Sequence, residues 1–272
     1  MALLLVFDVG NTNIVMGSFE ADTLMYDWRM STDKNKTSDE YVVLIKQLLH
    51  YHDIQPSQIQ DVIVSSVVPD LMYSLEHAIR KLFNLMPLLV ETGINTGIEI
   101  QYDNPGQVGA DRIVNAISGY HKYGGPLIIV DFGTATTFCA ISKAGDYLGG
   151  TIAPGIKISS DALFQKAAKL PRIDLAKPGH VICKNTVSSM QSGIIYGYVG
   201  LIEYIVRKMK NELSPQPEEV QVIATGGLST LIASETEMID IVDKTITLEG
   251  LKIIYDMNKD GRDNGIPPDA SE

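Results

Sequence analysis

The feature that most constrains the fold is a pattern that occurs once in each half of the 272-residue chain. The sequences FDVGNTNIVMGSF, from Phe7, and VDFGTATTFCAIS, from Val130, each run from an apolar residue through Asp, any residue, Gly and polar residues into a second apolar segment. Each follows an apolar run, Leu3–Phe7 or Leu127–Val130, of the kind found in strands covered on both faces. Recurrence of one supersecondary unit indicates a fold built twice.

Helical and strand patterns alternate along the rest of the chain, which predicts an α/β fold with two similar halves and a cleft between them. Ser38 is expected to cap a helix over 39–51. Further helices are expected at 69–82, 110–122, 157–170, 186–211, 228–234 and 249–257, and strands at 14–19, 23–30, 62–65, 87–90, 221–224 and 238–242. We therefore expect an N-terminal half at 1–120, a C-terminal half at 121–257 and a polar, disordered tail at 258–272.

Composition excludes several classes of protein. A net charge of −11 without a basic cluster disfavours nucleic-acid and anionic-membrane partners. Cys139 and Cys183 make neither a disulfide framework nor a zinc site. No stretch approaches the roughly 18 apolar residues of a membrane span, and the opening run lacks the basic start of a signal peptide. A cytoplasmic location is the resulting expectation.

The two Asp-x-Gly turns are candidate phosphate sites. Gly10 permits a tight hairpin whose amides and hydroxyls could surround phosphate oxygens, with Asp8 acting through Mg²⁺. Asp131 and Gly133 repeat the arrangement, and two such turns facing across a cleft could hold the two ends of one triphosphate. The alternative for each turn taken alone is an ordinary β-turn rich in Gly and polar residues.

The sequence GADR is a third candidate, at the start of a predicted helix. Asp111 could accept a substrate proton and Arg112 could bind a substrate carboxylate, although an Asp in this position is also simply favoured by the helix dipole. Gly226 and Gly227 leave bare backbone that a flat ring could approach, with ordinary loop chemistry as the alternative. For Thr186, capping of the following helix is the local explanation.

Together the segments DVGNTNIVMG, GADR, DFGTATT, GGTIAPG and TGG resemble, in order, the motifs of type III pantothenate kinases. That family belongs to the sugar kinase/actin-like ATPase superfamily. The resemblance implies two actin-like (ribonuclease H-like) halves, each a mixed sheet with flanking helices. It also implies ATP-dependent phosphorylation of pantothenate to 4'-phosphopantothenate, the first step of coenzyme A biosynthesis, in a homodimer that uses Mg²⁺ and a monovalent cation, K⁺ or NH₄⁺.

The resemblance also implies roles for particular residues. The first phosphate-binding segment corresponds to Asp8, Val9, Gly10, Asn11, Thr12, Asn13, Ile14 and Val15. The pantothenate pocket corresponds to Tyr102, Gly109, Ala110, Asp111 as proton acceptor, Arg112 on the carboxylate, and Thr186, which can come from the neighbouring subunit. Asp131 matches the ligand of the monovalent cation, Thr134 an ATP phosphate contact, and Gly226 and Gly227 the nucleotide-side turn.

Two other functions remain open at this point. An actin-like ATPase or polyphosphate hydrolase would use water as acceptor and would not require the Asp111–Arg112 pair. A non-catalytic member of the family could lack Asp111 or the turn glycines Gly10 and Gly133, all of which this sequence retains.

Overall fold

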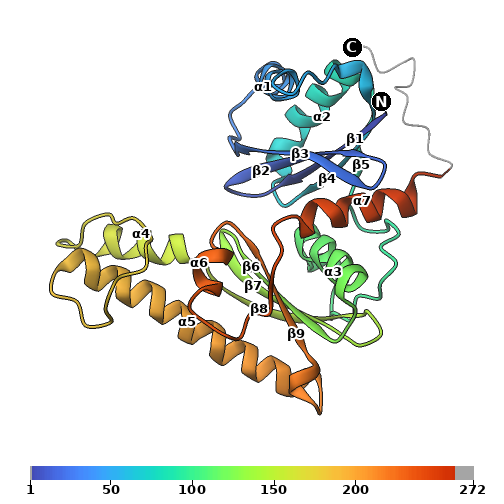
Figure 1. The fold of residues 1–272 in the computed structure, drawn as a ribbon. Coiled ribbons are helices and arrows are strands. Elements are labelled where there is room, and N and C mark those ends of the chain that lie inside the picture. The colour runs from blue at the N-terminus through green and yellow to red at the C-terminus, as the bar shows by residue number, and fades with distance from the viewer. Residues whose placement is uncertain (1, 261–272) are drawn as a thin grey trace. The chain divides into compact units, whose positions relative to one another are not determined.

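The computed structural model describes residues 2–260, which divide into two compact units (Figure 1). The first unit contains residues 2–97, 106–118 and 247–260, and the second contains 98–105 and 119–246. Each has its own five-stranded sheet. No described helix is long and apolar enough to cross a membrane.

In the first unit the strand order is β3-β2-β1-β4-β5. The first three strands form an antiparallel meander, as predicted, and β4 and β5 continue the sheet in parallel. The strands are β1 (Leu3–Val9), β2 (Asn13–Glu20), β3 (Thr23–Ser31), β4 (Ile59–Ser66) and β5 (Leu88–Leu89). The helices and helical turns are α1 (Ser38–His50), η1 (Pro56–Gln58), α2 (Pro69–Phe83), most of α3 (Ala110–Tyr123) and α7 (Ile246–Asn258).

The second unit repeats this topology with the order β8-β7-β6-β9-β10. Again three strands are antiparallel neighbours and the last two are parallel to the first. The strands are β6 (Leu127–Phe132), β7 (Ala135–Ile141), β8 (Tyr147–Pro154), β9 (Gln221–Gly226) and β10 (Ile241–Val242). The helices are α4 (Ile156–Lys166), α5 (Thr186–Leu213), η3 (Pro217–Glu219) and α6 (Ser229–Ala233), and η2 (Pro105–Gln107) lies at a boundary between the units. The predicted duplication and fold class are confirmed.

The alternation of side chains along β1 decides where the first acidic residue points. Leu3, Leu5, Phe7 and Val9 lie in the apolar core that α1 and α2 cover. Residues of even number lie on the opposite face of the sheet. Helix α7 lies on this side of the sheet (Figure 1), and its Leu248 packs at Gly17 of β2. Asp8 therefore projects from the α7 side of the sheet.

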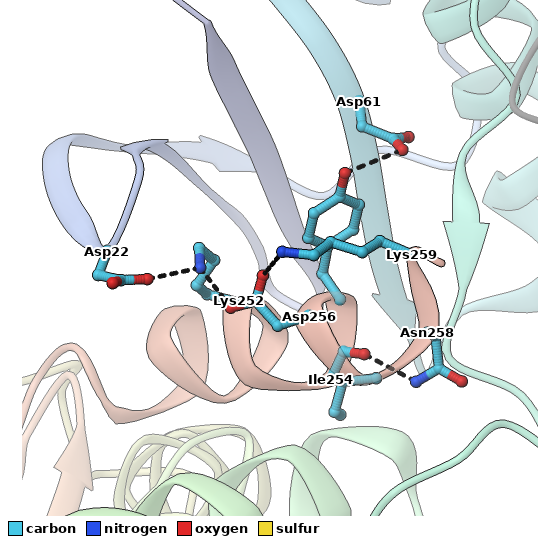
Figure 2. Close-up of polar contacts among 8 residues, drawn as sticks. Asp22, Asp61, Lys252, Ile254, Asp256, Asn258 and Lys259 are labelled. Carbon is cyan, nitrogen blue, oxygen red and sulfur yellow. Dashed lines mark hydrogen bonds and ion pairs between the residues drawn. The ribbon is translucent and has the colours of Figure 1, made fainter. Parts of the chain in front are cut away.

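The contacts divide the chain differently from the single cut expected after residue 120. Helix α7 belongs to the first unit, because its Lys252 pairs with Asp22 and its Tyr255 donates to Asp61 (Figure 2). Residues 98–105 belong to the second unit. From residue 261 on, the expected disordered tail lies outside the described residues.

Two local expectations are wrong. The cap of α1 is Thr37 rather than Ser38: the Thr37 hydroxyl accepts from the backbone N–H of Glu40, whose carboxylate accepts from the Thr37 N–H at 2.8 Å. This reciprocal pair is a capping box, which the Thr-x-x-Glu spacing encodes. No strand was expected over the glycine-rich residues 149–154, but they form much of strand β8, because pairing with β7 satisfies their backbone.

Candidate active site

Asp8 is partly buried near the end of β1, between two neighbouring strands. It pairs with Val15 of β2 and with Ser65 of β4, whose hydroxyl donates to Asp8 Oδ1 at 2.8 Å. The net effect of its surroundings is to raise the pKa of Asp8 from 3.8 to about 6. Burial is the largest cause of the rise, the Ser65 hydrogen bond opposes it, and the negative charge of Asp111 adds to it. Asp8 is thus a carboxylate in an environment that favours its neutral form unless a cation is present.

The turn after Asp8 is fixed by backbone hydrogen bonds. The Gly10 N–H donates to the Asn13 carbonyl at 3.0 Å, which closes the hairpin. Thr32, just after β3, donates from its hydroxyl to the Gly10 carbonyl at 2.6 Å and from its N–H to the Thr12 carbonyl at 3.0 Å. The turn is therefore held from both ends without using the side chains at its tip.

Burial along this segment separates structural from available side chains. Val9 and Ile14 are fully buried in the apolar core, so that only their backbone could touch a ligand. Asn11 and Thr12 are exposed at the tip, and Val15 is half-buried. Amide and hydroxyl groups at the tip are the kind of donors that phosphate oxygens accept from.

Asp111 begins helix α3 and belongs to the same unit as Asp8. Its Oδ1 accepts from the Arg112 N–H at 2.8 Å. Burial raises the pKa of Asp111, while that hydrogen bond and the Arg112 charge lower it, and the net shift is upward. A raised pKa makes a carboxylate a better proton acceptor, provided that it is ionised when the substrate binds.

Gly109 lies close to the Asp111 carboxylate and to Val67. A Cβ there would lie 2.7 Å from Asp111 Oδ1 and 3.7 Å from a methyl group of Val67. Val67 follows β4, and its N–H donates to the carbonyl of Val9 at 3.0 Å. The start of α3 is thus packed against the ends of β1 and β4, which explains why the charge of Asp111 acts on Asp8.

Arg112 is a buried residue, only 6% exposed. A guanidinium keeps its charge when buried and forms two parallel hydrogen bonds to a carboxylate when geometry allows. The residue after the candidate proton acceptor is therefore a buried cation.

In the second unit, Asp131 occupies the position equivalent to Asp8, with Thr225 of β9 as its neighbour in the parallel register. Gly226 has φ +89°, and a Cβ there would lie 2.6 Å from Asp131 Oδ1 and 2.7 Å from the Phe132 backbone. Only glycine allows this approach. Two residues predicted separately, Asp131 and Gly226, are thereby brought into one site. Gly227, next to it, is exposed.

The turn that follows Asp131 is held by a second glycine. The Gly133 N–H donates to the Ala135 carbonyl at 3.1 Å, and the Gly155 N–H donates to the Thr134 carbonyl at 3.1 Å. A Cβ on Gly155 would lie 2.1 Å from that Thr134 carbonyl oxygen. Thr134 itself is exposed, so that its hydroxyl lies at the surface of a tightly held turn.

Tyr102 and Thr186 both belong to the second unit, whereas Gly109–Arg112 belong to the first. The Tyr102 ring lies 6.4 Å from that of Tyr147, centroid to centroid. Thr186 is exposed at the first position of α5, where Asn185 is the cap and accepts from the Ser188 N–H at 2.9 Å. Capping therefore explains Asn185 but not Thr186.

Two residues of the site were not predicted from the sequence. Ser65 donates to Asp8, and Thr225 pairs with Asp131. The available signal was a hydroxyl residue after an apolar run, in DVIVSS (from Asp61) and in VIATGG (from Val222). This signal becomes meaningful only when the strand order is known. Among residues 2–260 no group of three or more His, Cys, Asp or Glu side chains could hold a metal ion.

Comparison with known proteins identifies the family and the fold. The sequence model of the family described as type III pantothenate kinase matches residues 4–208, more than half of the chain. Among solved structures, a Campylobacter jejuni protein assigned to the Baf family of transcriptional activators is 21% identical, with a TM-score of 0.57, and the match covers 94% of this chain and 98% of that one.

Two further structures share the fold. The inorganic polyphosphate/ATP-glucomannokinase of Arthrobacter sp. strain KM is 13% identical with a TM-score of 0.51, over 94% of this chain and 99% of that one. The ethanolamine utilization protein EutJ of Carboxydothermus hydrogenoformans is 14% identical with a TM-score of 0.52, over 93% and 90%. At these identities the likeness establishes the actin-like, two-sheet fold alone.

The raised pKa of Asp8 predicts that Asp8→Asn stabilises the ligand-free protein at neutral pH. At pH 7 the carboxylate is ionised in both the folded and the unfolded state, and its burial destabilises the folded state. As the pH falls from about 6 towards 3.8, the folded state takes up a proton at Asp8, and this destabilisation disappears. The gain should be roughly 1–2 kcal/mol at pH 7, allowing for partial exposure, and should vanish below about pH 4.

Urea unfolding in the presence of a chelator, from pH 4 to 8, measures this difference. The exposed Asp103→Asn is the matched control and should leave stability unchanged. A variant at position 8 that is no more stable than wild type at pH 7 would show that the carboxylate is not destabilised by its surroundings.

Proposed function

Because this chain belongs to the type III pantothenate kinase family, we propose that it transfers the γ-phosphoryl group of ATP to the primary hydroxyl of pantothenate. Membership makes it a phosphotransferase of the kinase class that acts in coenzyme A biosynthesis. The observation that carries the proposal for this site is the Asp111 carboxylate, held over Gly109 at the start of α3 and close enough to Asp8 to raise its pKa.

Asp111 is the proton acceptor in the proposed mechanism. Phosphoryl transfer has a loose transition state, so that positioning and charge neutralisation supply most of the rate enhancement. The pantothenate oxygen attacks the γ-phosphorus in line, its proton passes to an Asp111 oxygen, and the bond to the ADP oxygen breaks. The upward shift of the Asp111 pKa supports this role, because the carboxylate is more basic than an exposed one.

The pantothenate pocket is proposed to include Arg112, which would bind the substrate carboxylate. Its burial supports this role, because a charged guanidinium in a largely dry site interacts strongly with an anion. Gly109 and Ala110 would contribute backbone, and Tyr102 would contribute a ring face. Thr186, exposed at the start of α5, would contact pantothenate from the neighbouring subunit.

The first turn is proposed to bind ATP phosphates through the segment from Asp8 to Val15. The donor set fits MgATP: amide and hydroxyl groups at the tip suit phosphate oxygens, and Asp8 is a partly buried carboxylate whose pKa is raised further by the charge of Asp111. Mg²⁺ bound with the nucleotide supplies charge neutralisation. Ser65 would hold the Asp8 carboxylate in one orientation through its 2.8 Å hydrogen bond.

Asp131 is proposed to hold the monovalent cation, with Thr134 on an ATP phosphate and Gly226 and Gly227 beside the nucleotide. The fit rests on Gly226, where a Cβ would lie 2.6 Å from the Asp131 carboxylate and occupy the space beside it. A cation there would offset part of the roughly four negative charges of ATP in an acidic protein with net charge −11.

The homodimer is proposed to form through the exposed face of α5. Gly193, Gly197 and Gly200 recur at helical spacing on this face, are exposed, and have open space where a Cβ would be. Val187, 43% exposed, and Ile182, 88% exposed, lie at or just before the start of the same helix. Apolar side chains beside small residues suit close packing against another helix.

Pantothenate-dependent release of ADP from MgATP, in K⁺ buffer, tests the function. Asp111→Asn should retain the fold and nucleotide binding and lower kcat by roughly 10²–10⁴-fold, because the proton acceptor is lost. The exposed Asp103→Asn is the matched control. ADP release without pantothenate would favour the hydrolase, and no release from folded protein would favour a non-catalytic member. Near-normal turnover of Asp111→Asn would remove Asp111 from its role.

Replacement of K⁺ by Na⁺ tests the role of Asp131. Activity should fall severalfold in Na⁺ and be sustained by NH₄⁺, and Asp131→Asn should abolish the difference between the cations. Initial rates at constant ionic strength measure the effect. Equal rates in K⁺ and Na⁺ would contradict the assignment.

Gly197→Glu tests the interface by placing a charged side chain on the proposed face of α5. The wild-type chain should have the mass of a dimer by light scattering, and the variant that of a monomer. Gly179→Glu is the matched control, because Gly179 is also exposed in open space but lies outside the helix. A variant that remains dimeric would place the interface elsewhere.

A further inference from the structure

Helices α3 and α7 make an unusually close contact within the first unit. A Cβ added to Gly250 of α7 would lie 2.3 Å from the carbonyl oxygen of Val114 in α3. Beside it, the Thr247 hydroxyl donates to Asn115 Oδ1 at 2.7 Å. The obstacle at Gly250 is backbone rather than the end of a flexible side chain, so an added methyl group must move one helix relative to the other.

This contact lies one turn from the proposed proton acceptor. Val114 and Asn115 follow Asp111 by three and four residues, which is the spacing of neighbours on one face of a helix. One helical turn rises about 5.4 Å, and a helix transmits a displacement over that distance with little loss. A shift of α3 at Val114 therefore moves the Asp111 carboxylate by a similar amount.

The same helix α7 is attached to the sheet that carries Asp8. Its Leu248 packs at Gly17 of β2, where a Cβ would lie 3.0 Å from a Leu248 methyl group. Tyr255 donates to Asp61 of β4 at 3.2 Å, and Asp61 is only 6% exposed. Figure 2 shows this contact and the ion pair of Lys252 with Asp22. The hydrogen bond from Tyr255 to Asp61 is partly buried. Asp22 is 95% exposed, so its ion pair with Lys252 contributes little to stability.

We propose that α7 sets the position of Asp111 by holding α3 against the sheet, and that Thr247 and Gly250 are positioning residues for phosphoryl transfer. The inference rests on the proposed function, in which Asp111 accepts the substrate proton. Neither residue touches a reacting atom; both act through α3. A misplacement of about 1 Å in a reacting group can lower the rate about 10²-fold, so a small shift at the contact between α3 and α7 can have a large effect on kcat.

Gly250→Ala should therefore lower kcat by about 10–10²-fold while leaving the KM for ATP near its wild-type value. Thr247→Val, which keeps the shape but removes the donor to Asn115, should lower kcat by about 3–10-fold. Thr247→Ser retains the hydroxyl and should restore most of the rate. Asp22→Asn is the matched control: it removes the exposed partner of Lys252, leaves the contacts of Thr247 and Gly250 in place, and should not change kcat.

A double-mutant cycle with Asp111→Asn separates positioning from simple loss of packing. When the Asp111 carboxylate is absent, a shift of α3 can no longer misplace it. Gly250→Ala should therefore lower the kcat of Asp111→Asn by less than about twofold. A merely structural effect would multiply the two losses. All rates are measured well below the melting temperature of each variant, and Thr247→Val replaces Gly250→Ala in the cycle if the latter does not fold.

The outcomes are distinguishable. Multiplicative losses, or a normal kcat in folded Gly250→Ala and Thr247→Val, would overturn the positioning role and leave the proposed function intact. Near-normal turnover of Asp111→Asn alone would overturn the acceptor role and this inference with it. Non-additive losses with rescue by Thr247→Ser would establish it.

Discussion

The partly buried carboxylate of Asp8, near the end of β1, is the constraint on which the site depends. Asp8 is held between two strands, with one hydroxyl donor at 2.8 Å and a second negative charge nearby, and its pKa rises to about 6. An arrangement of this kind weakens the ligand-free protein, and it persists in folds where a bound cation or ligand offsets the cost. The fully buried apolar side chains on the other face of β1 supply the packing that tolerates it.

Duplication extends this constraint to the second unit, but the two copies are not identical. Asp8 lies beside Ser65 and Asp131 beside Thr225, so that each acidic residue has a hydroxyl neighbour on the parallel strand. The turns after the two acidic residues differ in length. In the first unit the last paired residues are Val9 and Ile14, and in the second they are Phe132 and Thr136, so fewer residues lie in the second turn. The same topology thus presents a longer turn in one unit and a tighter, glycine-lined one in the other.

The sequence was sufficient to predict those elements that depend on local patterns or that occur in both halves of the chain. The apolar run of β1, the meander, the Asp-x-Gly turns and the start of α3 follow from periodicity and turn chemistry. Strand β8 was missed because glycine lowers strand propensity and only pairing with β7 reveals it. The place of α7 depends on contacts such as Tyr255 with Asp61, between residues far apart in the chain, and no local pattern encodes them. Ser65 was missed for the same reason.

Asp8 and Asp111 come from elements that are far apart in the sequence, β1 and α3, and a third element links α3 to the sheet that contains β1. Helix α7 is this element, because it contacts β2 at Gly17, β4 at Asp61 and α3 at Val114. A helix near the end of the described chain thereby completes a site whose residues lie near its beginning. The first unit is therefore discontinuous in sequence: residues 2–97 and 106–118 alone would contain Asp8 and Asp111 but would lack the contacts of α7 with α3 and with the sheet.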